Sequence, residues 1–594
     1  MRPQGLFGAV VVCTAAVVLS GCEANPLKVF IARATDLGGV VYVDGASGSD
    51  TNDGTATSPL ATIQAGIELG SWYLEQELAT DVEVRVAEAT YEVPNAEDEP
   101  IELAEGVSLL GGYAAGFAER DPNRHTTTML DTRTSGDDVA AVVGGSGITS
   151  RTVVDGFTIV GGVASPSGIA RAIFLEYASP TISNCTVDAG LGNGAIDLYR
   201  ESDALIEGTD IVGSNGGAWK FALVASYDSV VTVRDCTIHG GSGGECTAVL
   251  FSDARGHIAD TAVYGGDADA TAWGIRLKNG ARVTVNGCTV DGGTSTSDTV
   301  TGIEVDEGSV GTIEDCDVFA ENPGRTAQGI FVQRDARARI NATSVVCGDA
   351  DRTIAVNVNG AEWANVDRCL LDGGTATTES VAVQGRDTSI AVTNSLISGG
   401  TSAGGCEAVV FDTATAQLSN NTICAGSGTS YAFGVSIVNS TPEISNNIIF
   451  TAGAPNQKAI HEHDTGAHVR RLLNNLFYLY DAAMYAYHDW DDPGGPGAGA
   501  IGVDDLETVL LPKPEVLEVS GNIEDDGTLL VFENESGFDS LVTTLFDNDW
   551  RLAASTDADV YEGGTVVVTD TSADFSGVER TDPWSIGAFE YDGP

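Results

Sequence analysis

A short alternation of apolar and polar residues recurs through the middle of the chain, in phrases such as SNCTVDAG, RDCTIHGG and NGCTVDGG. Thirteen copies align on one anchor position, and the mean step between anchors is about 26.5 residues. A fixed period of this length is typical of stacked structural repeats. The anchors are Phe157, Cys185, Thr209, Cys236, Thr261, Cys288, Cys316, Thr343, Cys369, Ser395, Asn421, Asn447 and Asn475.

The positions around the anchor predict short strands. Three residues before the anchor every copy has Val, Ile or Leu, and two residues after it every copy is apolar. The residue directly before the anchor is Asn, Asp or Gly in eleven copies, and Ala342 and Arg368 are the exceptions. Asn, Asp and Gly tolerate left-handed backbone angles. Each repeat is therefore predicted to be a strand, a one-residue kink and a second strand.

A third strand precedes each pair, as in GIRLKNG from residue 274 and GIEVDEG from residue 302. Three short strands per turn of about 26 residues predict an all-β parallel β-helix solenoid of about 13 coils. With about 4.8 Å between neighbouring coils, thirteen coils give a rod on the order of 60 Å long.

Both open ends of such a solenoid need a cover, because the end strands leave backbone groups unpaired. At the front, Ser58 and Pro59 predict the start of a short capping helix that turns Leu60, Ile63 and Ile67 to one face. Covering the first coil is the role we expect for this helix.

At the far end we expect an irregular cap. The outward position after the anchor becomes apolar late in the rod, at Leu370, Leu396, Ile448 and Leu476. Apolar residues on an outer face imply a cover. Part of residues 480–594 is predicted to fold back over these coils, and an unknown partner is the alternative.

The anchor cysteines are predicted to be structural. They lie between two inward aliphatic positions, and cysteine is among the most often buried residue types, which argues against a redox or metal array. Only Cys288 and Cys316 occupy the anchor in successive coils, where their spacing would suit a disulfide in an oxidising compartment. The predicted stack is Cys185, Cys236, Cys288, Cys316 and Cys369.

The first residues predict export. Arg2 is followed by an apolar run over residues 6–18, which is too short to span a membrane and is typical of a signal peptide. Leu19-Ser20-Gly21-Cys22 resembles the lipobox of bacterial lipoproteins, which implies acylation of Cys22 and a membrane partner through the lipid anchor. An ordinary secretory signal is the alternative. Glu23 after the cysteine favours the outer membrane by the same resemblance, so the protein is expected at the cell envelope or cell surface.

The strongly negative net charge limits the classes of partner that this protein can bind. The chain has 85 acidic and 29 basic residues, for a net charge of −56. Nucleic acid and anionic membrane surfaces should be repelled. Anionic polysaccharide should be repelled too unless divalent cations bridge it. Because the acids are spread along the chain and are not concentrated in one tail, we favour solubility in a salty or extracellular setting as their explanation.

Three segments resemble known proteins. YVDGASGSDTNDGTATSPLATIQAGI resembles the opening of bacterial pectin-lyase-like right-handed β-helix proteins, including some pectate lyases. LLGGYAAGFAERDP and IGAFEY resemble the entry and closing segments of surface β-helix proteins of that fold. The resemblance implies a right-handed parallel β-helix, but this superfamily mixes lyases, hydrolases, epimerases and adhesins. The predicted divisions are a lipoprotein signal peptide (1–21), an anchor linker (22–39), an N-terminal cap with the first coils (40–135), the repeats (136–480), and C-terminal coils with a cap (481–594).

The resemblance implies a substrate along the outer face of the third strand. Arg276 and Lys278 share that face because side chains alternate along a strand, and Glu304 and Asp306 should lie one coil further on. The Arg-Leu-Lys of this segment is similar to the Arg-x-Lys of polygalacturonases, but their other motifs have no counterpart in register. These four residues are candidate catalytic groups, and an ion-pair ladder across coils is the alternative.

Two segments are candidate metal sites. Asp44, Asp50 and Asp53 lie in an Asx- and Gly-rich stretch that would suit calcium, the one cofactor the resemblance suggests, although such residues also form ordinary turns. His461 and His463 alternate onto one face and would suit a transition metal.

We therefore expect a surface-anchored β-helix lipoprotein that binds extracellular polysaccharide or another surface ligand without catalysis. The alternative is a polysaccharide lyase or glycoside hydrolase that acts along the outer face, and a purely structural role in the envelope is a third possibility. The sequence leaves the oligomeric state open.

Overall fold

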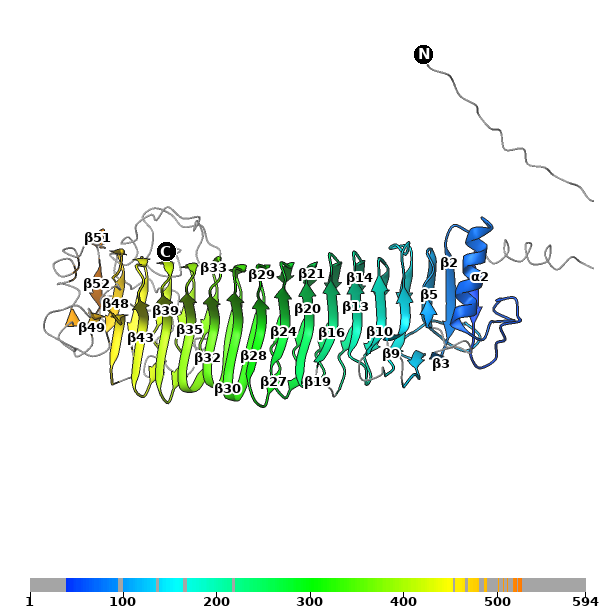
Figure 1. Ribbon diagram of the computed structural model, residues 1–594, viewed down its shortest axis with the longest axis horizontal. Helices are drawn as coiled ribbons and strands as arrows, with labels where there is room; N and C mark the ends of the chain where they lie inside the picture. The colour runs from blue at the N-terminus through cyan, green and yellow to red at the C-terminus, as the bar shows by residue number, and fades with distance from the viewer. Residues whose placement is uncertain are drawn as a thin grey trace, which may run out of the picture.

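In the computed structural model the chain forms a long rod of stacked β-strands with one helix at its N-terminal end (Figure 1). The strands pair in parallel from coil to coil, which confirms the predicted all-β solenoid, and the rod has about 14 turns. The structure describes residues 39–93, 100–134, 138–163, 168–215, 219–451, 455–464, 468–479, 485–488, 500–501, 506, 510, 516–520 and 522–525.

The strands before each kink form a sheet of seventeen. In spatial order these are β1 (Val40–Val43), β2 (Val82–Ala87), β5 (Val107–Tyr113), β8 (Val153–Asp155), β11 (Thr181–Ser183), β14 (Asp203–Glu207), β17 (Val230–Arg234), β21 (Arg255–Ala259), β25 (Arg282–Asn286), β29 (Val310–Glu314), β31 (Arg337–Asn341), β33 (Trp363–Asp367), β36 (Ser389–Thr393), β40 (Thr415–Ser419), β44 (Glu443–Ser445), β47 (Arg471–Leu473) and β51 (Glu518–Ser520).

The strands after each kink belong to a second sheet of 32 strands. They are β3 (Ala89–Val93), β6 (Thr127–Asp131), β9 (Thr158–Val160), β12 (Thr186–Asp188), β15 (Asp210–Val212), β18 (Thr237–His239), β22 (Ala262–Tyr264), β26 (Thr289–Asp291), the first parts of β30 (Asp317–Gln333) and β32 (Ser344–Asn359), β34 (Leu370–Asp372), β37 (Leu396–Ser398), β41 (Thr422–Cys424), β45 (Ile448–Thr451), β48 (Leu476–Leu479) and β52 (Ile523–Asp525).

The predicted third strands form the rest of that sheet, which we call the long ladder. In spatial order these are β4 (Ile101–Glu102), β7 (Asp138–Gly144), β10 (Ile169–Glu176), β13 (Gly194–Tyr199), β16 (Trp219–Ser226), β20 (Glu245–Ser252), β24 (Ala272–Lys278), β28 (Thr299–Val305), the last parts of β30 and β32, β35 (Thr375–Arg386), β39 (Gly405–Asp412), β43 (Tyr431–Val438), β46 (Gln457–Glu462) and β49 (Tyr485–His488).

Short strands complete the corners. β38 (Thr401–Ser402) and β42 (Ser427–Gly428) extend the start of β35, and β50 (Ala500–Ile501) runs antiparallel to β49. A third sheet consists of β19 (Ser242–Gly243), β23 (Asp267–Ala268) and β27 (Thr294–Ser295).

The kink has the predicted left-handed geometry in every repeat. All thirteen residues before the anchor have φ between 48° and 77°, including Ala342 at 48° and Arg368 at 54°. The aliphatic residue before the kink and the apolar residue after it are buried in all thirteen repeats. The register therefore imposes this angle even where the side chain disfavours it.

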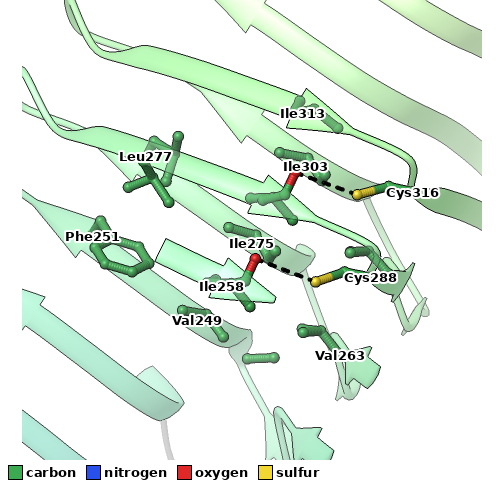
Figure 2. Packing of buried hydrophobic residues seen from close by; sticks show 14 of the residues in the cluster. Val249, Phe251, Ile258, Val263, Ile275, Leu277, Cys288, Ile303, Ile313 and Cys316 are labelled. Atoms are coloured by element: carbon green, nitrogen blue, oxygen red, sulfur yellow. Dashed lines mark hydrogen bonds between the residues drawn. The ribbon is translucent and has the colours of Figure 1, made fainter. Parts of the chain in front are cut away.

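The five anchor cysteines point inward and are at most 5% exposed. Each thiol donates to a nearby carbonyl, as Cys185 Sγ does to the oxygen of Ser183 at 3.1 Å. Figure 2 shows Cys288 and Cys316 one above the other among buried aliphatic side chains. Burial raises the pKa of the Cys369 thiol to about 12. All nine cysteines among the described residues are free and buried, as a structural stack requires.

Late in the rod the anchors are asparagines that bond to one another. The side-chain nitrogen of Asn421 donates to Asn447 Oδ1, and that of Asn447 donates to Asn475 Oδ1, both at 3.0 Å. Asn475 donates in turn to Asn522 Oδ1 at 3.1 Å. Asn522 is therefore a fourteenth anchor, which the sequence pattern missed because 47 residues separate it from Asn475.

The capping helix exists, but it begins later than predicted. Helix α2 spans Ile63–Glu75, and Thr62 is its N-cap, because the Thr62 hydroxyl accepts from the backbone of Ala65 at 3.2 Å. Ser58 instead belongs to a turn whose amide bonds to the Thr55 carbonyl. The helix lies against β1 and β2 at the first coil. Among the described residues no helix has both the length and the apolar character needed to cross a membrane.

Two predictions fall mainly outside the described residues. The signal peptide (1–21), Cys22 and all but the last residue of the linker (22–39) lie there, and so does most of 481–594. Within the described part, Leu396, Ile448 and Leu476 are at most 4% exposed although they follow the anchor on its outward side, and Leu370 is half-buried. The segment predicted to cover them, within residues 480–594, lies mostly outside the described residues.

Candidate functional site

Lysines are rare in this chain, and the structure gathers them on one side of the rod. The sequence has five, and the three that the structure describes, Lys220, Lys278 and Lys458, all come from strands of the long ladder. None of the three forms an ion pair within the described part of the chain, whereas arginines of the same strands do. Lys278 is half-buried, whereas Lys220 and Lys458 are 6% and 8% exposed. Among the described residues, Arg255 and Arg282 of the seventeen-stranded sheet are exposed and also form no ion pair.

Lys220 and Lys278 line one depression with a volume of about 150 Å³, which we call the lysine hollow. Its other lining residues are Phe221, Glu245, Thr247, Leu250, Ser252, Arg276 and Asn279. Tyr199 and Ser226 lie in register with Ser252 and Lys278 on neighbouring coils. Tyr227 is 57% exposed, and its ring meets that of Tyr199 edge-on at 4.9 Å. Aromatic rings therefore border the hollow.

Two of the four predicted catalytic residues form an ion pair. Arg276 Nε lies 2.6 Å from Glu304 Oε2, and the guanidinium stacks on the Trp273 ring at 4.1 Å. Glu304 also accepts from Gln333 Nε2 at 2.8 Å, and burial raises its pKa. Arg276 and Glu304 thus serve as a link between coils, as the ion-pair alternative predicts.

Asp306 was expected to point outward, and this is wrong. The residue follows β28 in a turn and is fully buried. Its carboxylate accepts from the backbone of Glu307 at 2.7 Å and lies 3.2 Å from Arg334 Nη1. Arg334, whose side chain is 60% exposed, and the Glu307 amide hold this carboxylate, so it is not available to a ligand. Of the four candidates, Lys278 is the one left facing the hollow without an ion pair among the described residues.

The aspartates near the N-terminus bond to their own turn. Asp44 accepts from the amide of Ala46 at 2.9 Å, and Asp53 accepts from the Thr55 hydroxyl at 3.0 Å. Asp50 accepts from two amides and one hydroxyl just ahead of α2. The turn alternative accounts for all three carboxylates.

The densest group of ionisable side chains on the long ladder lies in its last coils. We call it the histidine cluster; its members are Glu407 on β39, Ser436 on β43, Lys458 and His461 on β46, His463 just after β46, and His488 on β49. Residues up to 81 positions apart in the sequence lie together here, because Ser436, His461 and His488 pair in turn on successive coils.

The cluster contains two connected halves. In one, the Ser436 hydroxyl donates to Glu407 Oε1 at 2.6 Å, and His463 Nε2 lies 3.8 Å from the same oxygen. In the other, His461 Nδ1 lies 3.1 Å from His488 Nδ1 and 3.2 Å from Lys458 Nζ. The rings of His461 and His463 are 4.2 Å apart and join the two halves.

Burial shifts the protonation of these groups toward their neutral forms. It raises the pKa of Glu407 to about 7 and lowers the pKa of Lys458 to about 8. Burial, and then the neighbouring Lys458, lower the pKa of His461 to about 2. The pKa of His463 is lowered by the same two causes. The site therefore holds a proton-bearing carboxyl group beside unprotonated imidazoles near neutral pH.

The predicted pairing of His461 with His463 on a metal ion has no third ligand here. Among the described residues no group of three or more His, Cys, Asp or Glu side chains is placed to hold a metal ion. The contacts of His461 are instead His488 and Lys458. Sequence analysis missed Glu407 and Lys458, whose only signal is their place in the repeat register.

The raised pKa of Glu407 predicts a stability difference that depends on pH. The folded state binds the Glu407 proton more tightly than the unfolded state does. The stabilisation that this proton gives the fold is therefore complete below about pH 4.5 and is lost as the pH rises to 7. The free energy of unfolding of Glu407→Gln should equal that of the wild type near pH 4.5 and exceed it by about 3 kcal/mol at pH 8. Urea unfolding at both pH values measures this, with the exposed Glu362→Gln as the control; a gap independent of pH would contradict it.

Two family models match parts of this chain. Residues 171–345 match the family model described as a right-handed β-helix region, and residues 46–240 match a family of unknown function, DUF1565. No curated protein sequence matches the chain.

Several solved structures match at low identity. Tailspike protein 3 of bacteriophage CBA120 is 10% identical, with a TM-score of 0.35, over 82% of this chain and 65% of the tailspike. The A-module of the Azotobacter vinelandii mannuronan C-5 epimerase AlgE4 is 13% identical, with a TM-score of 0.32, over 73% of this chain and 95% of the module. Pectate lyase Pel9A is 12% identical, with a TM-score of 0.23, over 93% of this chain and 96% of the enzyme. The family match, together with the pairing of the strands, identifies the middle of this chain as a right-handed β-helix region.

Proposed function

We propose that this protein is a surface-anchored rod that binds an acidic extracellular polysaccharide along the long ladder. The observation that carries the proposal is the placement of Lys220, Lys278 and Lys458 on this one ladder, without ion pairs in the described part of a chain whose net charge is −56. Lys220 Nζ donates to the Gly192 carbonyl at 2.5 Å, and Lys458 Nζ lies 3.2 Å from His461 Nδ1. Acidic groups on a ligand would add the negatively charged partners that all three lysines lack.

The spacing of the lysines suits a polymer. From β16 to β46 the ladder has nine strand-to-strand steps, or about 43 Å at about 4.8 Å per step. A compact ligand would reach one or two of these charges, whereas an extended chain with repeated acidic groups would reach all three. Tyr227, which is 57% exposed, offers its ring to the apolar faces of sugars, whereas Arg200 lies over the Tyr199 ring at 4.8 Å.

The overall negative charge does not prevent this contact. At physiological ionic strength the field of a distant charge is screened over about 8 Å, so the acidic remainder of the rod acts weakly on a ligand at the ladder. Contact with the lysines is local and is screened less. An acidic polymer could therefore contact the lysines without a bridging divalent cation.

The anchoring part of the proposal rests on the sequence. A lipid on Cys22 would tether the rod to the membrane and leave the ladder free to meet polymers outside the cell. Radiolabelled fatty acid incorporation that disappears in Cys22→Ala would support it, and unlabelled protein in the culture medium would contradict it.

Binding to immobilised polygalacturonate tests the ladder. Lys278→Gln combined with Lys458→Gln should lower the affinity about tenfold, or about 1.4 kcal/mol, and weaken its salt dependence. The control variant, Arg234→Gln with Arg337→Gln, removes two positive charges from the seventeen-stranded sheet instead. Equal losses in both variants, or equal retention on an uncharged glucan, would contradict the proposal.

A further inference from the structure

We propose that Cys288 and Cys316 are a modification site, at which oxidation joins two adjacent coils of the rod by a disulfide. The sequence showed only that these two anchors follow one another in the repeat. The structure adds the register of the two coils, the direction of the two side chains and a contrast with the other anchor cysteines. The inference goes beyond the proposed function and shares with it only the expectation that the protein is exported.

The register places the two cysteines opposite each other. Asn286 pairs with Glu314 two residues before the anchors, and Thr289 pairs with Asp317 directly after them. Because the strands on both sides of the kink are in register, the two cysteine backbones are one coil apart, or about 4.8 Å. A disulfide needs Cα atoms that are about 4.4 to 6.8 Å apart, so this separation suits one.

Both side chains point into the core. Figure 2 shows them one above the other among buried aliphatic side chains, and each cysteine is 2% exposed. In the reduced form the Cys288 thiol donates to the Asn286 carbonyl at 3.2 Å, and the Cys316 thiol donates to the Glu314 carbonyl at 3.0 Å. The two side chains thus share one orientation, and rotation about a Cα–Cβ bond turns one sulfur toward the other.

The other anchor cysteines have a different neighbour in the next coil. For Cys185, Cys236 and Cys369 that neighbour is a hydroxyl side chain, which accepts from the backbone amide of the cysteine at 3.4, 3.3 and 3.1 Å. Cys316 has such a hydroxyl as well, at 3.5 Å. After Cys288 the same position is taken by the Cys316 thiol. A thiol therefore replaces the usual hydroxyl at the one step of the anchor pattern where two coils can be joined covalently.

The bond forms by exchange with an oxidant that itself carries a disulfide, the class of oxidant that exported proteins meet as they fold. Hydrogen bonding with the Cys316 thiol lowers the pKa of Cys288, which makes Cys288 the attacking thiolate. Cys288 breaks the S–S bond of the oxidant and forms a mixed disulfide. The Cys316 thiolate then attacks the Cys288 sulfur and releases the rest of the oxidant. Two electrons pass to the oxidant, which leaves as two thiols that carry the two protons of the cysteines.

Burial and position decide when the bond forms and what it does. Both cysteines are buried once the coils have stacked, so the exchange takes place during folding or local opening of the rod. In the unfolded chain the bond removes conformational freedom, which stabilises the folded state. Coils of a solenoid are stabilised by contacts with their neighbours, so a bond in the middle of the rod also supports the coils on either side.

The test incubates the purified full chain with glutathione disulfide at a urea concentration just below the unfolding transition, and then alkylates every remaining thiol. No Lys or Arg lies between the two cysteines, so the protein is digested with a protease that cleaves at acidic residues. The wild type should give a linked pair of peptides, containing Cys288 and Cys316, that separates on reduction. Cys288→Ser should leave Cys316 alkylated, whereas Cys236→Ser, whose next-coil neighbour is Thr261, should keep the linked pair.

Urea unfolding of the oxidised protein gives a second readout. Dithiothreitol present throughout the titration should lower the unfolding midpoint of the wild type by roughly 0.5–1 M. The reductant should lower the midpoint of Cys236→Ser by the same amount and leave that of Cys288→Ser unchanged.

Two results would overturn the inference. One is alkylation of both cysteines in the wild type, or a link from either of them to a third cysteine. The other is a reductant effect of equal size in Cys288→Ser. The incubation does not depend on where the protein resides, so a failure of the anchoring proposal, seen as missing fatty acid incorporation, is distinguishable from a failure of this one.

Discussion

Asn447→Ala should lower the free energy of unfolding by roughly 3–5 kcal/mol. Asn447 is fully buried at an anchor position, and its side chain makes five hydrogen bonds. It donates to the carbonyls of Leu418 and Ser445 and to Asn475 Oδ1, and it accepts from both the backbone and the side chain of Asn421. Alanine removes all five and leaves buried donors and acceptors without partners, which costs more than the bonds themselves contribute.

Urea unfolding measures this effect, and Asn279→Ala is the matched control. Asn279 makes one exposed side-chain hydrogen bond, to Ser252, and has a left-handed φ of 56°, so its replacement should cost about 1 kcal/mol. A double variant with Asn421→Ala should lose less than the sum of the two single changes, because the two side chains share bonds. Strict additivity would show that the asparagines act independently and not as a ladder.

Gly400→Ala is expected to destabilise the rod by roughly 2–5 kcal/mol. Gly400 belongs to a column of corner glycines with φ between 72° and 91°, namely Gly241, Gly266, Gly293, Gly374, Gly400 and Gly426. A Cβ on Gly400 would come within 2.2 Å of the carbonyl oxygen of Gly374 in the preceding coil. The coils would have to separate at this corner, in addition to the cost of a left-handed angle for alanine.

Gly280→Ala measures the cost of the left-handed backbone angle alone. Gly280 has φ of 79°, but a Cβ there would meet nothing within 4 Å. Its loss should therefore be limited to about 1 kcal/mol for the backbone angle. If Gly400→Ala and Gly280→Ala unfold at the same urea concentration, contact with the preceding coil adds no cost to a side chain at this corner.

The kink shows which features of the repeat can be predicted from the sequence and where the prediction fails. Its period, its inward aliphatic residues and its Asn, Asp or Gly are local features, so they can be recognised in the sequence one repeat at a time. Ala342 and Arg368 break the local preference and still adopt positive φ, because the neighbouring coils fix their backbone. The pattern failed at Asn522, where a long insertion hides the spacing although the side chain continues the asparagine ladder.

The candidate sites depended much more on the tertiary structure. Arg276 and Glu304 were expected to be neighbours across coils, and they are, since register follows from the period. Asp306 was expected to be exposed, but it is buried and pairs with Arg334 of the next coil. The histidines were visible as a cluster in the sequence, but Glu407 and Lys458 lie in unremarkable strands and become significant only beside them.

The sequence by itself determined the solenoid, its period, the inward stack of cysteines and the positions of its kinks, because each depends on residue types repeated at a fixed local spacing. The tertiary structure alone decided which ionisable groups meet, which are buried, and on which side the lysines gather. The physical reason is that burial and pairing on a β-helix come from residues in adjacent coils. Those residues are about one full turn apart in the chain, where no local pattern links them.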